Sequence, residues 1–229
     1  MRVIAIGCEY TGKTALLEGL MKWGDERGIR HHLDDHFSIP DRQFLKKEEQ
    51  EEMLKLSPVL KERFQRFQVV YHLRLINHYD HILLGGFHIE EDIYGPLYYY
   101  PGRPTPHPPS TYEAEMPSDA ILVLLTASPE GIEKRMREAP HDFPLVPAKD
   151  VKTVLERFEG AYRASWLQHK IRIDTSDLSP EELLQKFLDA SVPHLNTRDL
   201  LPQFAQLPRG QRGLAVQCAR HRRQRCRRR

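Results

Sequence analysis

The sequence of 229 residues has few of the features that would place it in a special class of protein. It contains only three cysteines, Cys8, Cys218 and Cys226, and this odd number without metal-ligand spacing predicts neither a disulfide framework nor a zinc site. The longest apolar run, Ala120–Leu125, is far shorter than the ~20 residues that cross a bilayer. No cationic leader followed by an apolar core opens the chain. We therefore expect a reduced, cytoplasmic protein without a membrane segment.

Acidic residues are missing from the carboxyl-terminal end. None follows Asp199, and nine of the 34 lysines and arginines lie at 209–229; the other 25 face 32 acids, a net charge of −7 for residues 1–208. A basic arm of this kind can bind nucleic acid. A segment rich in Gln and Arg with few apolar residues more often stays disordered. We expect a folded unit at 1–195 and a disordered basic tail at 196–229.

Short apolar runs alternate with helix-like segments along the rest of the chain. Buried strands are predicted at 3–6, 29–33, 81–86, 120–125 and 170–174. Helices are predicted at 13–23, 46–56, 57–79, 128–138, 150–168 and 179–190. Three of these helices open with Ser-Pro, an N-cap followed by proline at the first helical position. The alternation predicts an α/β fold with a mainly parallel five-stranded sheet and helices on both faces.

The strongest motif lies between the first strand and the first helix. Gly7–Thr14 fits the pattern G-x-x-x-x-G-K-[ST] in full. Glycines let the backbone curl so that its N–H groups and the helix N-terminus face phosphate oxygens. Lys13 can then reach the β- and γ-phosphates, and the Thr14 hydroxyl can coordinate Mg²⁺. The pattern predicts the three-layer fold of P-loop NTPases and an ATP site made of Gly7, Cys8, Glu9, Tyr10, Thr11, Gly12, Lys13, Thr14 and Ala15.

Glu9 is an unusual residue for such a loop. A carboxylate among phosphate-binding amides is unfavourable unless it points away or has a cationic partner. It can accept a hydrogen bond from a hydroxyl of the phosphate acceptor, or it can simply face solvent. The sequence leaves both readings open.

Residues 1–190 resemble the thymidylate kinases within the nucleoside and nucleoside-monophosphate kinase group. That family carries an acid at the loop position of Glu9, an L-x-x-x-P-E segment like Leu125–Glu130, and an aromatic helix segment like Phe158–Tyr162. The resemblance implies an ATP- and Mg²⁺-dependent kinase with a lid at about 134–149. It also implies that the lid arginines Arg135 and Arg137 approach the phosphates, and that two copies pair through their long helices.

The chain departs from that family on the acceptor side. Gly85–Asp92 stands where thymidylate kinases have an Asp-Arg-Tyr-like motif. The base-reading arginine of the long helix has no clear counterpart, since Tyr71, His72 and Arg74 occupy the region after Phe67. The acceptor is therefore not specified as dTMP.

Acidic residues follow two of the predicted strands, where ligands of open α/β sheets collect. Such carboxylates suit a hydroxyl acceptor, which gains from a group that orients it and accepts its proton, whereas a phosphate acceptor needs cations. Each carboxylate has a plainer alternative, because aspartates cap turns and glutamates favour first helical turns. Aromatic residues commonly fill cores, and we expect Phe67, Trp23 and Trp166 there. The candidate acceptor-binding residues are Glu9, Asp34, Asp35, Phe67, Arg74, Glu90, Glu91 and Tyr94.

Three functions follow from these motifs. The first is a nucleoside or nucleoside-monophosphate kinase with Lys13, Arg135, Arg137 and Asp35 as catalytic residues and Thr14 on the metal. The second is a P-loop kinase of a non-nucleotide small metabolite. The third is a nucleotide-binding regulatory protein whose tail binds nucleic acid. A GTPase is not indicated, because the N-K-x-D and D-x-x-G motifs are missing.

Overall fold

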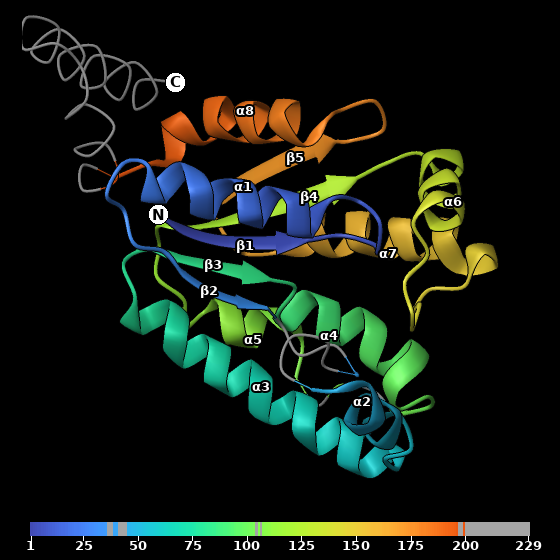
Figure 1. The fold of residues 1–229 in the computed structure, drawn as a ribbon. Helices are drawn as coiled ribbons and strands as arrows, with labels where there is room; N and C mark the ends of the chain where they lie inside the picture. Colours follow the sequence, from blue (N-terminus) through green and yellow to red (C-terminus); the bar gives the residue numbers. More distant parts are fainter. Residues whose placement is uncertain (36–38, 41–44, 104, 106, 197–198, 200–229) are drawn as a thin grey trace, which may run out of the picture.

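A computed structural model describes residues 1–35, 39–40, 45–103, 105, 107–196 and 199, the side chain of Asp35 excepted. Its five strands form one parallel sheet in the order β2-β3-β1-β4-β5, and they point in one direction in Figure 1. The predicted fold class is confirmed. The strands are β1 (Arg2–Ile6), β2 (His32–Asp35), β3 (Ile82–Gly85), β4 (Ala120–Thr126) and β5 (His169–Asp174).

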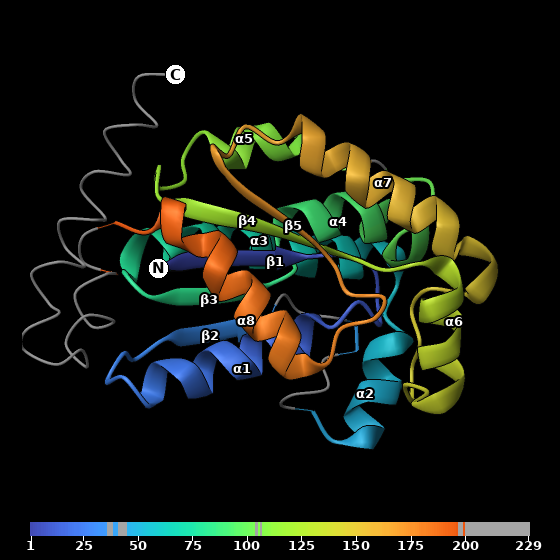
Figure 2. The same ribbon diagram turned by 90° about the horizontal axis from the view of Figure 1, so that it is seen from above.

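Helices cover both faces of this sheet, as Figures 1 and 2 show. The α-helices are α1 (Lys13–Asp25), α2 (Lys47–Leu54), α3 (Pro58–His78), α4 (His88–Tyr94), α5 (Pro109–Glu113), α6 (Pro129–Glu138), α7 (Val151–Ala164) and α8 (Pro180–Ser191). Short turns of other helix types span Gly95–Tyr99, Ala148–Asp150 and Val192–His194.

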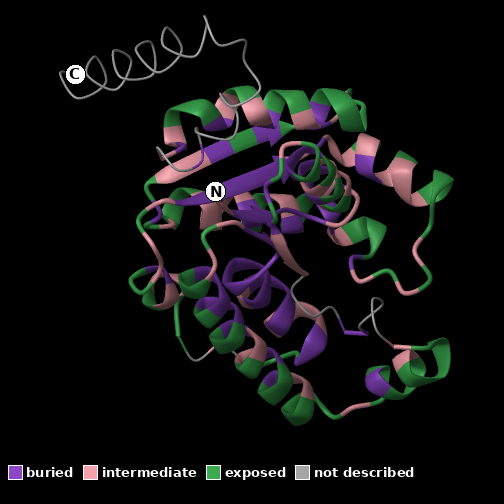
Figure 3. Cartoon of the chain, turned by 60° about the vertical axis from the view of Figure 1, so that its left-hand side comes forward, coloured by how far each residue is buried: buried purple, intermediate pink, exposed green. Residues whose placement is uncertain are grey.

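The central strand β1 feeds two hydrophobic cores. Ile4 and Ile6 pack with side chains of α3, α4 and α7, whereas Val3 and Ala5 pack with α1 and α8. Successive side chains of a strand point to opposite faces, so a strand covered on both sides is apolar at every position. The strands accordingly form the buried centre of the molecule in Figure 3.

Serine caps begin the three predicted Ser-Pro helices. The Ser57, Ser128 and Ser179 hydroxyls accept hydrogen bonds from the backbone N–H groups three residues later. Each cap satisfies one of the otherwise unpaired N–H groups of a first helical turn, an effect of about 1 kcal/mol. The starts of α3, α6 and α8 are thus confirmed.

Two predicted boundaries are wrong. The strand expected at 29–33 is shifted to His32–Asp35, because the Ile29 amide donates to Gly24 O and closes the end of α1. The helix expected at 150–168 ends at Ala164, and Trp166 beyond it is 67% exposed rather than in the core.

Two predicted segments of the chain, the lid and the tail, differ in how much of each the structure describes. The predicted lid comprises the end of α6 and the segment up to Lys149. Of the predicted tail, the structure describes only Asn196 and Asp199, so its disorder stays a prediction. Among the described residues, none of the helices has the length and apolar character needed to cross a membrane.

Candidate functional site

The loop between β1 and α1 has the backbone that its glycines predict. Gly7 has φ +152° and Gly12 φ +92°, conformations that L side chains rarely adopt. A Cβ on Gly7 would collide with the backbone carbonyl of Leu125 on the neighbouring strand β4. Tyr10, with φ +64°, is the one non-glycine residue of the loop in the left-handed region. The loop therefore curls at the carboxyl end of β1, in the middle of the sheet.

Side-chain hydrogen bonds within the loop and from neighbouring segments hold its conformation. The Thr11 hydroxyl donates to Cys8 O at 2.7 Å, and the Thr175 hydroxyl donates to Thr11 O at 3.0 Å. Cys8 is buried, and burial raises the pKa of its thiol to about 12, so it stays protonated and inert. Tyr94 lies beneath the loop with its hydroxyl 3.4 Å from Gly7 O.

Lys13 meets an acidic residue from another strand end. Its Nζ lies 2.5 Å from Glu90 Oε1 and donates to Gly7 O at 2.6 Å. Glu90 stands in the first turn of α4, which follows β3, the neighbour of β1 in the sheet. The side chains of Lys13 and Glu90 are only 18% and 11% exposed, so their attraction is weakly screened. The reading of Glu90 and Glu91 as first-turn residues is confirmed, and Glu90 in addition faces the phosphate loop.

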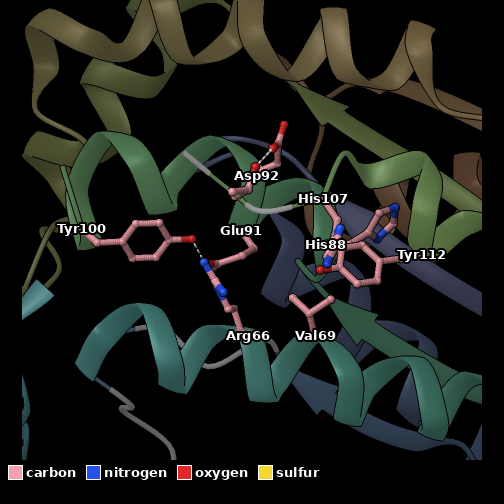
Figure 4. Close-up of a pocket in the computed structure, with 9 residues that line it drawn as sticks. Arg66, Val69, His88, Glu91, Asp92, Tyr100, His107 and Tyr112 are labelled. Carbon is pink, nitrogen blue, oxygen red and sulfur yellow. Dashed lines mark hydrogen bonds between the residues drawn. The ribbon is translucent and has the colours of Figure 1, made fainter. Parts of the chain in front are cut away.

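Glu91, the next residue of α4, faces a narrow cavity between α3 and α4 (Figure 4). It accepts a hydrogen bond from the Tyr100 hydroxyl, and Arg66 reaches toward it from α3 (Figure 4). The cavity has room for about one water molecule, so a larger ligand would have to displace side chains to enter. Its lining residues are Arg66, Val69, His88, Glu91, Asp92, Tyr100, Thr105, His107 and Tyr112.

One buried carboxylate pairs with two partly exposed arginines beside this cavity. Glu62 on α3 accepts hydrogen bonds from both Arg66 and Arg103. Burial by itself would raise the pKa of Glu62, but the Arg103 hydrogen bond and the charges of both arginines lower it overall. The arginines that line or flank the cavity are therefore matched by a carboxylate.

A second pair, His88 and Glu113, lies beside the same cavity. His88 Nε2 lies 3.0 Å from Glu113 Oε1, and the Trp166 amide donates to Glu113 Oε2 at 2.6 Å. Both side chains are fully buried. Burial opposes ionisation of Glu113, yet hydrogen bonds from His88, Ser165 and Trp166 lower its pKa. Glu113, at the end of α5, thus contacts both α4 and the segment after α7.

The lid arginines differ in their surroundings. Arg135 is folded back onto the protein, where its guanidinium donates to Tyr10 O at 2.9 Å and to the Thr175 carbonyl. Arg137 is exposed near the end of α6. Glu9, in the loop, faces the lid backbone at Leu145 and Val146.

The other predicted residues are spread over the molecule. Asp34 contacts the buried His72 at 3.2 Å, and the backbone of Asp35 pairs with β3 while its side chain lies outside the described part of the structure. Phe67, which is 72% exposed and so not in the core, and the exposed Arg74 lie on the outer face of α3. The structure does not bring these two side chains together with Lys13 and Glu90.

No group of three or more His, Cys, Asp or Glu side chains among the described residues is arranged to hold a metal. The exposed Thr14 hydroxyl, in the first turn of α1, and the Glu90 carboxylate are oxygen ligands of the kind that Mg²⁺ prefers. A metal would therefore need ligands from a bound nucleotide as well.

Sequence reasoning missed most of the cavity. Glu62, Arg66, Tyr100 and Glu113 lie in three separate segments, and only the fold brings them together. One signal was available on α3, where buried Glu62, Gln65, Val69 and His72 recur at helical spacing. Polar residues in that pattern indicate a face that packs against other polar groups.

No protein-family model and no curated protein sequence matches this chain. Solved structures are similar to it in fold. Deoxyadenosine kinase from M. mycoides with bound dATP is 13% identical, with a TM-score of 0.57 over 82% of this chain and 98% of that one. Thymidylate kinase from Candida albicans is 12% identical, with a TM-score of 0.56 over 82% and 89% of the two chains. Shikimate kinase from Acinetobacter baumannii with shikimate is 18% identical, with a TM-score of 0.50 over 82% and 90%.

The chain has the fold of the P-loop kinases. The predicted fold is thereby confirmed, and the Gly7–Thr14 loop lies at the carboxyl end of its central strand. The three similar structures bear names of kinases for a nucleoside, a nucleotide and a carboxylic metabolite. The similarity therefore shows the fold alone, because one fold can carry different activities.

Proposed function

We propose that this protein is an ATP- and Mg²⁺-dependent phosphotransferase that moves the γ-phosphate to a nucleoside or nucleoside monophosphate. The observation that carries the proposal is the Lys13–Glu90 pair at the rim of a curled Gly7–Thr14 loop. A cation for the phosphates and a carboxylate for the acceptor stand within 2.5 Å of each other, at the end of the sheet where ligands bind.

The loop supplies the donor half of the site. Amides of the curled backbone and the start of α1 favour an anion, and Lys13 would exchange Glu90 and Gly7 O for phosphate oxygens. Thr14 would hold Mg²⁺, which would supply positive charge to neutralise the phosphates. Arg135 and Arg137 are the proposed clamp for the transferring group, for which Arg135 would release Tyr10 O.

The acceptor half favours a hydroxyl over a phosphate. Glu90 lies beside Lys13, and Glu91 follows it on α4. Asp34 lies on β2, the strand next to β3 in the sheet. Among the described residues, the arginines at the cavity are paired with Glu62. A carboxylate close to the γ-phosphate can orient a hydroxyl and accept its proton. We propose Glu90 for this role beside Asp35, with Glu9, Phe67, Arg74 and Tyr94 remaining predictions for acceptor binding.

Replacing Lys13 by alanine tests the proposal directly. ATP-dependent turnover of a panel of nucleosides and nucleoside monophosphates should fall by at least about 10²-fold. Lys22→Ala, an exposed lysine of the same helix, is the matched control and should leave turnover unchanged. Equal turnover in the wild type and Lys13→Ala would refute a kinase that uses this loop.

A kinase of a non-nucleotide metabolite is the second candidate, favoured by Gly85–Asp92 in place of an Asp-Arg-Tyr motif. Thermal-shift measurements distinguish the two. Stabilisation by thymidine or dTMP supports the first candidate, and stabilisation by sugars or polyols alone supports the second.

The tail, the assembly state and the cytoplasmic location stay predictions. Deleting 209–229 should abolish salt-sensitive binding to DNA or RNA if the tail makes the protein a regulatory nucleic-acid binder.

A homodimer would use the exposed apolar side chains along α3, and Phe67→Ser should then shift the mass measured by light scattering to that of a monomer. These side chains are Val59, Leu60, Phe64, Phe67, Val70 and Tyr71.

A further inference from the structure

The turn between β3 and α4 has a strained backbone. Phe87 has φ +98° and ψ −151°, a region that essentially only glycine adopts. Gly86 before it has φ +79°, and its amide continues the pairing of β3 with β1 by donating to Ala5 O at 2.7 Å. The Phe87 carbonyl already accepts the first bond of α4, from the Glu91 amide at 3.0 Å. The chain therefore passes from strand to helix within two residues.

A glycine at position 87 would adopt this backbone without strain, yet the residue there is a phenylalanine. Its side chain is fully buried in the hydrophobic core on the α3 side of the sheet. Burial of an aromatic ring removes a large apolar surface from water, and this gain can offset the strain of the backbone. The strained conformation of Phe87 is therefore held by the packing of its own ring.

Two histidine rings pack against the ring of Phe87. The centroid of His72, on α3, lies 5.7 Å away with the planes inclined by 72°, and that of His88, on α4, lies 4.7 Å away at 71°. Aromatic rings favour such edge-to-face arrangements. His72 Nε2 lies 3.2 Å from Asp34 Oδ1 on β2. His88 Nε2 lies 3.0 Å from Glu113 Oε1 on α5. The position of Phe87 is thus tied to three other elements of the fold.

Phe87 lies three residues before Glu90, which contacts Lys13 from the first turn of α4. Residues three apart on a helix have Cα atoms about 5 Å from each other. A backbone rotation of about 30° at Phe87 would therefore move the start of the Glu90 side chain by roughly 2–3 Å. Such a shift exceeds what a hydrogen bond tolerates. The contact of 2.5 Å between Lys13 Nζ and Glu90 Oε1 thus depends on the backbone conformation of Phe87.

We propose that Phe87 is a positioning residue that directs Glu90 to Lys13. Without the packing of its ring, the strain would be released by a turn of the backbone, and the first turn of α4 would carry Glu90 away from the Gly7–Thr14 loop. The placing of Glu90 stands on the contacts alone, whereas its consequence for phosphoryl transfer rests on the proposed function.

The first experiment tests the strain with alanine and glycine variants. In a regular helix, glycine raises the unfolding constant about fivefold above alanine. We expect this order for Phe187→Gly and Phe187→Ala, the matched control, because Phe187 is an equally buried residue of α8. At position 87 the order should invert, with Phe87→Ala about fivefold or more above Phe87→Gly. Urea denaturation measures all four constants, and the ordinary order at both positions would overturn the proposal.

The second experiment measures the placing of Glu90 and needs no nucleotide. A double-mutant cycle of Lys13→Met and Glu90→Gln gives the coupling of the pair as a ratio of unfolding constants. We expect a coupling of about fivefold or more in the wild-type background. In the Phe87→Leu background, where the side chain stays apolar but the ring is lost, the coupling should fall below about twofold. In the Phe187→Leu background it should keep its wild-type value.

These leucine variants decide the proposal even if the alanine and glycine variants fail to fold. A coupling that Phe87→Leu leaves unchanged would show that another part of the structure directs Glu90. An equal loss in the Phe187→Leu background would show that the coupling follows general stability. Either result overturns the proposal, and so does the absence of coupling in the wild-type background.

A third measurement extends the test to the reaction. Phe87→Leu should lower kcat by about tenfold or more and change KM for ATP less than about twofold, because a displaced carboxylate weakens the chemical step. An equal fall of kcat in Phe187→Leu would overturn the consequence for catalysis. If the wild type phosphorylates none of the nucleosides and nucleoside monophosphates, the proposed function fails, and the nucleotide-free cycle still decides whether Phe87 directs Glu90.

Discussion

Two adjacent glutamates divide the site into two halves of different construction. Glu90 faces the phosphate loop and pairs with Lys13, while Glu91 faces the cavity under α3 and accepts from Tyr100. Neighbours on a helix are turned by about 100° from each other, so one helical turn serves both halves. The donor half is built by consecutive residues of one loop. The cavity under α3, which we propose as part of the acceptor half, is lined by α3, α4, α5 and the segments between them.

The two halves therefore respond differently to change. Backbone geometry sets the donor half, where glycines allow the turn and amides face the ligand. Side-chain pairing sets the acceptor half, where Glu62, Glu91 and Glu113 each have polar partners. We expect substitutions in the first half to abolish chemistry or folding of the loop, and substitutions in the second to alter acceptor choice and stability.

The largest expected effect separates the two glutamates. Glu90→Gln should lower kcat by about 10²–10⁴-fold, because the carboxylate beside Lys13 is the proposed acceptor base. Glu91→Gln should chiefly raise KM for the acceptor. Steady-state kinetics of both variants checks this, and equal effects on kcat would contradict the division.

A substitution in the loop backbone should come next. Gly7→Ala should reduce the free energy of unfolding by about 2–4 kcal/mol, because φ is +152° and the added Cβ meets the Leu125 carbonyl. Gly160→Ala in α7, where a Cβ meets nothing within 4 Å, should instead stabilise by about 0.5–1 kcal/mol. Urea denaturation measures both, and a harmless Gly7→Ala would mean that the loop is not set by its backbone.

The ion pairs of the acceptor half should contribute less. Glu62→Ala should destabilise by about 1–2 kcal/mol, because it leaves the partly exposed Arg66 and Arg103 without their shared carboxylate. Glu51→Ala, an exposed position on α2, is the control. If Glu62→Ala matched the control in urea denaturation, pairing would not stabilise this half.

Acidification should affect the acceptor half with no change at neutral pH. The pKa values of Glu62 and Glu113 lie below their usual 4.5 in the folded protein, so the unfolded state binds more protons below that pH. The contribution of these two carboxylates to the free energy of unfolding should be fully present above pH 4.5. It should be lost as the pH drops through the pKa values of the folded protein. Glu62→Gln should flatten this slope, and a slope that did not change would oppose the assignment.

His31 provides a reference outside both halves. Burial lowers its pKa from 6.5 to about 4, so the unfolded state binds the extra proton between these values. Stability should therefore rise with pH from about 4 to 6.5, and His31→Gln should remove that part of the profile alone.

The elements of the fold were largely predictable from the sequence. Continuous apolar runs located four of the five strands, and Ser-Pro caps located the starts of α3, α6 and α8, because both depend on local chemistry. Boundaries at Ile29 and Ala164 failed where a turn competed for the backbone amide or a helix ended without a breaker. Trp166 and Phe67 failed as core residues, since an aromatic side chain does not reveal which face of the molecule it will occupy.

Sequence alone determined the curled Gly7–Thr14 loop, because eight consecutive residues carry both its backbone freedom and its charge. Tertiary structure decided which carboxylate meets Lys13, which arginines are already paired, and that Glu9 faces the lid. Those contacts join residues that are between 4 and 137 positions apart, most of them far apart in the chain. Such partners are selected by the packing of helices on a sheet, and local pattern carries no record of that choice.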